Sequence, residues 1–165
     1  MAGLNTLWLL EALPGAQFEN IALMAGAAAF GSLLPDLDAS QSKIKHLRIG
    51  GIKPFYLPAE AIYHQLGHRT FLHSLAGLAY IAIVCAVLSP FIGWQAALAL
   101  WLGYASHLVA DGVTKSGIPL LYPKSKRFHL LPKALRITTG SLEEEVVFVL
   151  LSLSILAFLL RHLAI

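Results

Sequence analysis

The sequence is short of both cysteine and charge. Its 165 residues include one cysteine, Cys85, so the chain can form neither an internal disulfide nor a cysteine-based zinc site. Only 13% of the residues are charged while 57% are hydrophobic, which leaves too little polar surface to cover a water-soluble domain. These proportions exclude intrinsic disorder and a disulfide-stapled secreted fold. They also require any bound metal to be held by His, Asp or Glu side chains.

The apolar residues lie in long runs rather than alternating with polar ones. Four runs predict transmembrane helices, at residues 16–34, 70–92, 95–113 and 146–160. The second run is the clearest, because it carries no formal charge, and the fourth is short unless the preceding glutamates belong to the same helix. We therefore predict an all-α fold, an integral membrane helical bundle of about four transmembrane helices, formed by residues 1–165 as a single domain.

The positive charges are confined to two of the predicted loops. Of the 12 Lys and Arg residues, five lie between the first and second spans and six lie between the third and fourth. The positive-inside rule places both loops in the cytoplasm and both termini on the opposite side of the membrane. These charges are then topology determinants, so no nucleic-acid partner is predicted, and membrane lipid with an anionic headgroup is the more natural partner.

Candidate metal ligands fall at the cytoplasmic end of all four predicted spans. An antiparallel bundle brings such ends together, and His and carboxylate groups from facing helices are how helical bundles build metal sites. The first three spans contribute Asp36, Asp38, His68, His73, His107 and Asp111, and the fourth begins with Glu143, Glu144 and Glu145.

His107 and Asp111 form the most direct pair, because a spacing of four places both side chains on one helix face. Gly103, one turn earlier, leaves room for a neighbouring helix to approach. The pair could chelate one cation, or it could be a hydrogen bond that satisfies two buried polar groups. Ionisable residues inside a span are costly, which favours the functional interpretation.

Two further sets of candidate ligands lie where the first and second predicted spans border the loop between them. Pro35 ends the first span, and an extended chain after it would project Asp36 and Asp38 to the same side, as ligands or as an ordinary polar turn. Thr70 is a plausible N-cap of the second span, which would place His73 in the first helical turn.

Arg69 and Glu144 are the candidate catalytic residues. Arg69 could clamp a phosphate oxygen or simply pair with one of the aspartates. Ser141 and Glu144 match a capping box, which gives Glu144 a structural explanation as well.

Four motifs in order resemble the LexA-regulated, membrane-bound, metal-dependent hydrolase family of bacterial inner-membrane proteins. The motifs are LLPDLD at 33–38, GHRTFLHS at 67–74, GYASHLVAD at 103–111 and GIPLLYP at 117–123. The resemblance implies a fold distantly like zinc-dependent phospholipase C and P1-type nucleases, and a location in the bacterial inner membrane with the active site facing the cytoplasm. It also implies metal-site roles for Asp36, Asp38, His68, His73, His107 and Asp111, with the stretch around Glu144 as a further contributor.

The chain departs from the family at its start, where members usually carry a histidine. The first histidine here is His46. A start site placed downstream of the true one, a smaller number of metals, or water in the ligand position would each account for the difference.

The donor set predicts a cofactor and a chemistry. Nitrogen and oxygen ligands without sulfur favour Zn or Mn, and six or seven candidates are enough for two ions. The leading hypothesis is a metal-dependent hydrolase of a phosphoester, lipid or lipid-linked, in which the metal activates water. The alternatives are a membrane protein that binds or conducts a divalent cation without hydrolysis, and a structural protein whose loops dock a partner.

Overall fold

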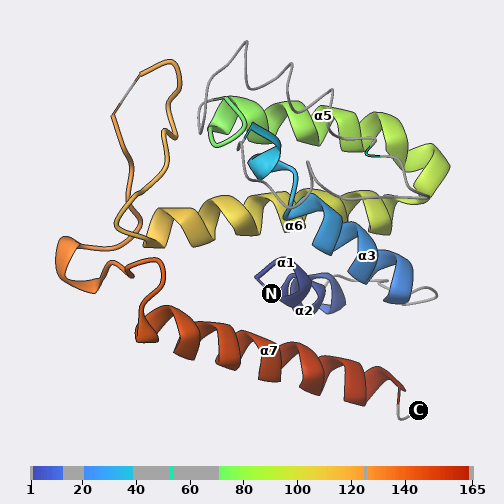
Figure 1. Ribbon diagram of the computed structural model, residues 1–165. Helices are drawn as coiled ribbons and strands as arrows, with labels where there is room; N and C mark the ends of the chain where they lie inside the picture. The colour runs from blue at the N-terminus through green and yellow to red at the C-terminus, as the bar shows by residue number, and fades with distance from the viewer. Residues whose placement is uncertain (1, 13–20, 39–52, 54–70, 125, 164–165) are drawn as a thin grey trace.

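The computed structural model describes residues 2–12, 21–38, 53, 71–124 and 126–163, and within these ranges the chain is all-α, as predicted (Figure 1). Two isolated β-bridges are present in the described ranges, but no strand. The elements in chain order are α1 (Ala2–Asn5), α2 (Leu7–Glu11), α3 (Ile21–Gly31), the 3₁₀ helix η1 (Pro35–Asp38), α5 (Leu75–Ile92), α6 (Trp94–Val113), the 3₁₀ helix η2 (Lys133–Leu135) and α7 (Leu142–Leu163).

Two described helices, α5 and α6, are long and apolar enough to cross a membrane by length and composition. They agree with the predicted spans at 70–92 and 95–113, and they meet at a sharp turn where Gly93 adopts a positive φ of 84°. A left-handed conformation of this kind is accessible to glycine at little cost. The described part of the first predicted span is the 11-residue α3, and the fourth lies within α7. A bundle of four transmembrane helices stays a prediction.

The start of the second predicted span is corrected by the structure. Its N-cap is Ser74 rather than Thr70, so His73 lies in the turn before α5 and not in its first helical turn. The Ser74 hydroxyl oxygen accepts a hydrogen bond from the Gly77 N–H at 3.2 Å, and the hydroxyl itself donates to the Phe71 carbonyl at 2.6 Å. These two bonds close the turn and fix where the helix begins.

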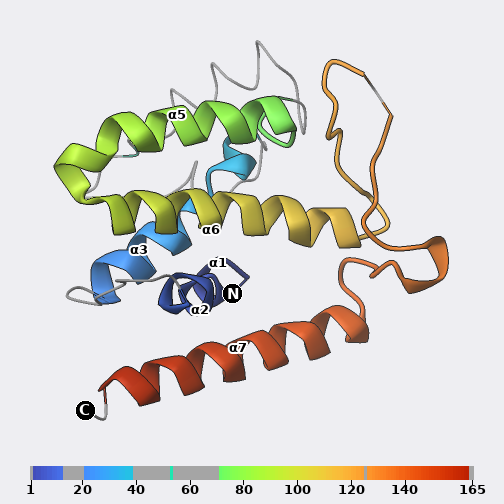
Figure 2. The same cartoon turned by 180° about the vertical axis from the view of Figure 1, so that it is seen from behind.

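Helix α6 is the centre of the arrangement, because α1, α3 and α5 all pack against it (Figures 1 and 2). The crossing of α3 and α6 is very close. A Cβ added to Gly31 would collide with the Leu100 carbonyl oxygen, and one added to Gly103 would collide with that of Ala28. As predicted, Gly103 leaves room for a neighbouring helix to approach, and that helix is α3.

Helix α7 joins the rest of the fold through the N-terminal segment. Ile155 and Phe158 are buried together with Leu7 and Leu10 of α2. Both views show α1 and α2 lying between α7 and the α3–α6 layer (Figures 1 and 2). The C-terminal side of α7 is also held to α2 by an ion pair of 3.2 Å between Arg161 Nη2 and Glu11 Oε1.

We predict opposite outcomes for two glycine substitutions on α3. Gly31→Ala places a methyl group against the α6 backbone and should lower the free energy of unfolding by about 1–3 kcal/mol, the usual cost of overpacking. Gly26→Ala is the matched control, since a Cβ there meets open space, and it should stabilise the helix by about 0.5–1 kcal/mol. Unfolding in mixed detergent micelles measures both. Equal effects of the two substitutions would show that the close crossing is wrong.

Candidate metal centre

His73 is held in place by the turn that precedes α5. Its side chain is fully buried. On one side of it, the Tyr104 hydroxyl of α6 donates a hydrogen bond to the Leu72 carbonyl. On the other side, the Leu75 N–H donates to the Leu120 carbonyl at 3.0 Å. The turn is therefore tied to α6 and to the loop after α6, and the imidazole is fixed between them.

His107 and Asp111 lie on one face of α6, as their spacing predicts. The distance from His107 Nε2 to Asp111 Oδ2 is 3.8 Å. The same Asp111 oxygen lies 3.6 Å from His73 Nε2, so the two imidazoles approach one carboxylate from α6 and from the start of α5.

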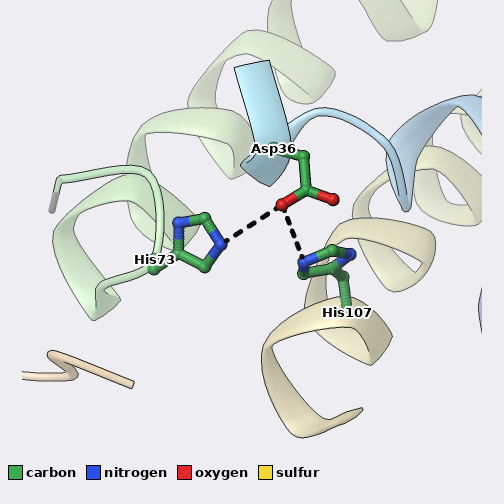
Figure 3. A group of neighbouring side chains, drawn as sticks. All are labelled: Asp36, His73 and His107. Carbon is green, nitrogen blue, oxygen red and sulfur yellow. Dashed lines mark ion pairs between the residues drawn. The ribbon is translucent and has the colours of Figure 1, made fainter. Parts of the chain in front are cut away.

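Asp36 completes the group from η1. Its Oδ1 atom lies 3.8 Å from His73 Nε2 and 3.6 Å from His107 Nε2, and Figure 3 shows the carboxylate pointing between the two rings. The extended chain predicted after Pro35 is wrong, because residues 35–38 form a 3₁₀ helix. Proline suits the first turn of a helix, where its missing N–H costs nothing, and the Leu37 N–H donates to the Leu34 carbonyl at 3.1 Å.

The donor atoms of Asp36, His73, His107 and Asp111, which we name the donor cluster, are spaced for a shared cation. Their Nε2–Oδ separations of 3.6–3.8 Å exceed a good hydrogen bond. Two ligands at about 2.0–2.2 Å from a tetrahedral metal would stand about 3.3–3.6 Å apart, close to what is observed. Within the described ranges, His107 Nε2 and Asp111 Oδ2 are buried and make no hydrogen bond. Buried polar atoms left in this state are costly, and a cation between them would remove the cost.

The electrostatics of the cluster favour a cation as well. Asp111 lies in the last turn of α6 and Asp36 follows α3, so both carboxylates are near the partially negative carboxyl ends of helices. The Asp111 side chain is only 17% exposed, while that of Asp36 is 35% exposed. The Asp36 side is thus the open side of the cluster.

A cavity of about 350 Å³ adjoins the donor cluster and is called the first cavity below. Asp36 and His107 line one end of it, and Glu144 at the start of α7 lines it too. Most of the remaining wall is apolar, with Val113, Phe148 and Leu151 among its residues. Its size is in the range of small-molecule sites, which combine an apolar wall with a few polar groups.

Glu144 forms the predicted capping arrangement. Its N–H donates to the Ser141 hydroxyl at 3.4 Å, and its Oε2 accepts from the Gly140 N–H at 2.5 Å. A hydrogen bond from Ser141 also holds the pKa of the neighbouring Glu143 carboxyl below its usual range. The Glu144 carboxylate thus has a structural role and a position on the cavity wall at the same time.

Three of the predicted site residues have side chains outside the described part of the structure. His68 and Arg69 lie outside the described residues, and Asp38 belongs to η1 although its side chain is not described. The residue that sequence reasoning missed is Tyr104, which anchors the His73 turn. Its spacing of three and seven residues from His107 and Asp111 puts it on their helix face, and that pattern was the available signal.

Comparisons with known proteins give a family and no chemistry. The family described as YdjM inner membrane protein matches residues 1–164. The chain is 35% identical over 132 residues to the uncharacterized protein YvsG of Bacillus subtilis (strain 168), covering 80% of this chain and 75% of that one. It is also 35% identical over 107 residues to the inner membrane protein YdjM of Escherichia coli (strain K12), covering 63% of this chain. The matched part is 51%, about half, of that YdjM protein. No solved structure matches.

Tyr104→Phe tests the anchor of the His73 turn. The substitution leaves the buried Leu72 carbonyl without its donor and should lower the free energy of unfolding by about 0.5–1.5 kcal/mol. Tyr80→Phe, which removes a hydroxyl from a 54% exposed side chain on α5, is the matched control and should have no measurable effect. Detergent unfolding curves of both variants provide the measurement. A Tyr104→Phe protein as stable as the wild type would contradict the anchoring role.

Proposed function

We propose that this chain, which belongs to the YdjM inner membrane protein family, is a membrane-bound, metal-dependent hydrolase acting on a phosphoester at the cytoplasmic membrane face. The substrate class is a lipid or lipid-linked phosphoester. The observation that carries the proposal is the donor cluster, in which Asp36, His73, His107 and Asp111 gather from three segments beside an apolar-walled cavity.

The chemistry of the donors favours Zn²⁺ or Mn²⁺. Two imidazoles and two carboxylates, without sulfur, suit either ion, and Mn²⁺ with six positions would leave two for water and substrate. A bound metal of this kind lowers the pKa of a water molecule and polarises a phosphoryl oxygen. If a second metal ion bound, Asp38 and His68 would be its candidate ligands.

The chain's own residues supply the remaining parts. Asp36, the more exposed of the two carboxylates, lines the first cavity and is the member of the cluster that can be reached from it. Glu144, at the amino end of α7, lines that cavity and is suited by position to accept a proton from water there. In the proposal Arg69 steadies the negative charge that develops on the phosphoryl oxygens.

The positively charged side chains that follow α6 support the proposed orientation, in which the donor cluster lies at the cytoplasmic side of the membrane. Asp111 is two residues from the end of α6, and a basic loop begins there. Its cations are Lys115, Lys124, Lys126, Arg127, Lys133 and Arg136. Positive loops face the cytoplasm, so the donor cluster is placed at the inner leaflet, where lipid phosphoesters are at hand.

Metal analysis and a phosphoesterase panel test the proposal together. Protein purified in detergent should contain Zn or Mn and hydrolyse a phosphodiester or phosphomonoester, with activity lost to a chelator and restored by the metal. His107→Ala should abolish both the bound metal and the activity, because it removes a donor. His129→Ala is the control, since its Nε2 lies 3.2 Å from the Lys115 carbonyl, away from the cluster. Wild-type protein without bound metal would refute the proposal, and metal flux in liposomes without turnover would favour the cation-conducting alternative.

Glu144→Gln separates the two roles of Glu144. The glutamine carbonyl can still accept from the Gly140 N–H, so stability should change little, whereas loss of a general base should lower kcat by about 10²–10⁴-fold. Glu145→Gln removes the same charge from the same helical turn, at an exposed position, and serves as the control. Equal activities of the two variants, measured by steady-state kinetics, would leave Glu144 as a helix cap alone.

A further inference from the structure

A groove runs between α6 and α7 and leads away from the donor cluster. A second cavity of about 430 Å³ lies beside the first, and the two share Ala2, Ser106, Ala110, Val113, Val147 and Leu151. We call the two cavities together the α6–α7 groove. In both overall views α6 and α7 run alongside each other on either side of the N-terminal segment (Figures 1 and 2).

The groove is about as long as one leaflet of a bilayer is thick. Its α6 wall extends from Leu102 to Val113 along one helix face, a distance of about 16 Å at 1.5 Å per residue. Half of the hydrocarbon core of a bilayer is about 15 Å. His107, near the middle of this wall, connects the groove to the donor cluster, and the Leu102 end lies toward mid-membrane in the proposed orientation.

The hydroxyl side chains along the groove donate to backbone carbonyls. The hydroxyl of Thr6 donates to the Gly3 carbonyl at 2.6 Å, and that of Ser106 donates to the Gly103 carbonyl at 2.7 Å. Ser32 and Thr114 donate in the same way to the Ala29 and Asp111 carbonyls, both at 2.8 Å. Away from the polar end of the first cavity, the walls therefore present mainly hydrocarbon to an occupant.

The apolar walls of the groove fit an extended hydrocarbon chain as the occupant. An α-helix is about 10 Å across with its side chains. A hydrocarbon chain is thinner and gains dispersion contacts with both walls. A chain in the groove would also keep its ester end near the donor cluster.

We propose that the α6–α7 groove binds one acyl chain of a membrane glycerophospholipid, with the phosphate of that lipid at the donor cluster. The inference rests on the proposed function for the reaction and narrows its substrate class to a lipid that carries an acyl chain. The exposed edge of the groove at Val109, which is 55% exposed, lets the chain enter sideways from the bilayer.

Photolabelling of the full chain in vesicles tests the groove without relying on turnover. The probe is phosphatidylglycerol with a diazirine near the end of one acyl chain, in vesicles of phosphatidylethanolamine and phosphatidylglycerol. Mass spectrometry should find the label on groove residues such as Leu102 and Leu151. Leu151→Trp fills the groove and should abolish this labelling. Leu150→Trp, one residue away and 60% exposed outside both cavities, is the matched control and should retain it.

Each outcome of the experiment decides the proposal. The proposal is overturned if the label is spread over the exposed faces of α5 and α7 and is unchanged by Leu151→Trp. It is also overturned if the groove is covered by a second copy of the chain, which then carries the label. Should Leu151→Trp fail to fold, Val109→Trp blocks the entry from an exposed position and should abolish the same labels. Groove labelling in a protein that lacks phosphoesterase activity would refute the hydrolase and leave the lipid site standing.

Discussion

Two imidazoles lie between two carboxylates in this protein, and bringing these four side chains together constrains the rest of the fold. The four donor atoms stand 3.6–3.8 Å apart in His–Asp pairs, too far for good hydrogen bonds and close enough to need a compensating charge. In an apolar membrane protein, ionisable groups in such numbers are expensive. The proposed cation would turn this cost into a stabilising interaction between segments that are distant in sequence.

The helix packing can be understood from the same requirement. Asp36 reaches the cluster only because α3 lies directly on α6, and that approach depends on glycine at positions 31 and 103. His73 reaches it because Tyr104 holds the preceding residue against α6. Since α6 carries His107, Asp111, Tyr104 and Gly103, a single helix supplies half of the donors and the contacts that bring the other half.

Much of this could be predicted from the sequence, where the physical signal is local. Composition alone is enough to find α5 and α6, because their apolar runs are long enough to cross a membrane. The one-face pairing of His107 and Asp111 follows from helix periodicity, and the nearness of Asp36 and His73 follows from antiparallel topology. These inferences need no knowledge of which helix touches which.

What could not be predicted depends on tertiary contacts. Ser74 and Thr70 are about equally good N-caps, and only the bonds to Phe71, Leu72 and Leu120 select Ser74. Pro35 ends one helix and can begin another, so the choice between an extended chain and η1 is made by the packing of η1 on α6. Hydropathy located α7 but predicted only residues 146–160 of a helix that spans Leu142–Leu163, and it could not predict the neighbours of α7, which are α1 and α2.

The placement of α7 explains how one short chain can offer both a polar centre and an apolar groove. If α7 packed directly on α6, the face of α6 that carries Ser106, Ala110 and Val113 would be covered, and the first cavity would have no room beside Asp36 and His107. The N-terminal segment keeps the two helices apart while burying Phe158 of α7 against Leu7 and Leu10. The C-terminal half of α7 thus provides the packing contacts. Its N-terminal end borders the first cavity, which Glu144 lines together with Asp36 and His107 of the donor cluster.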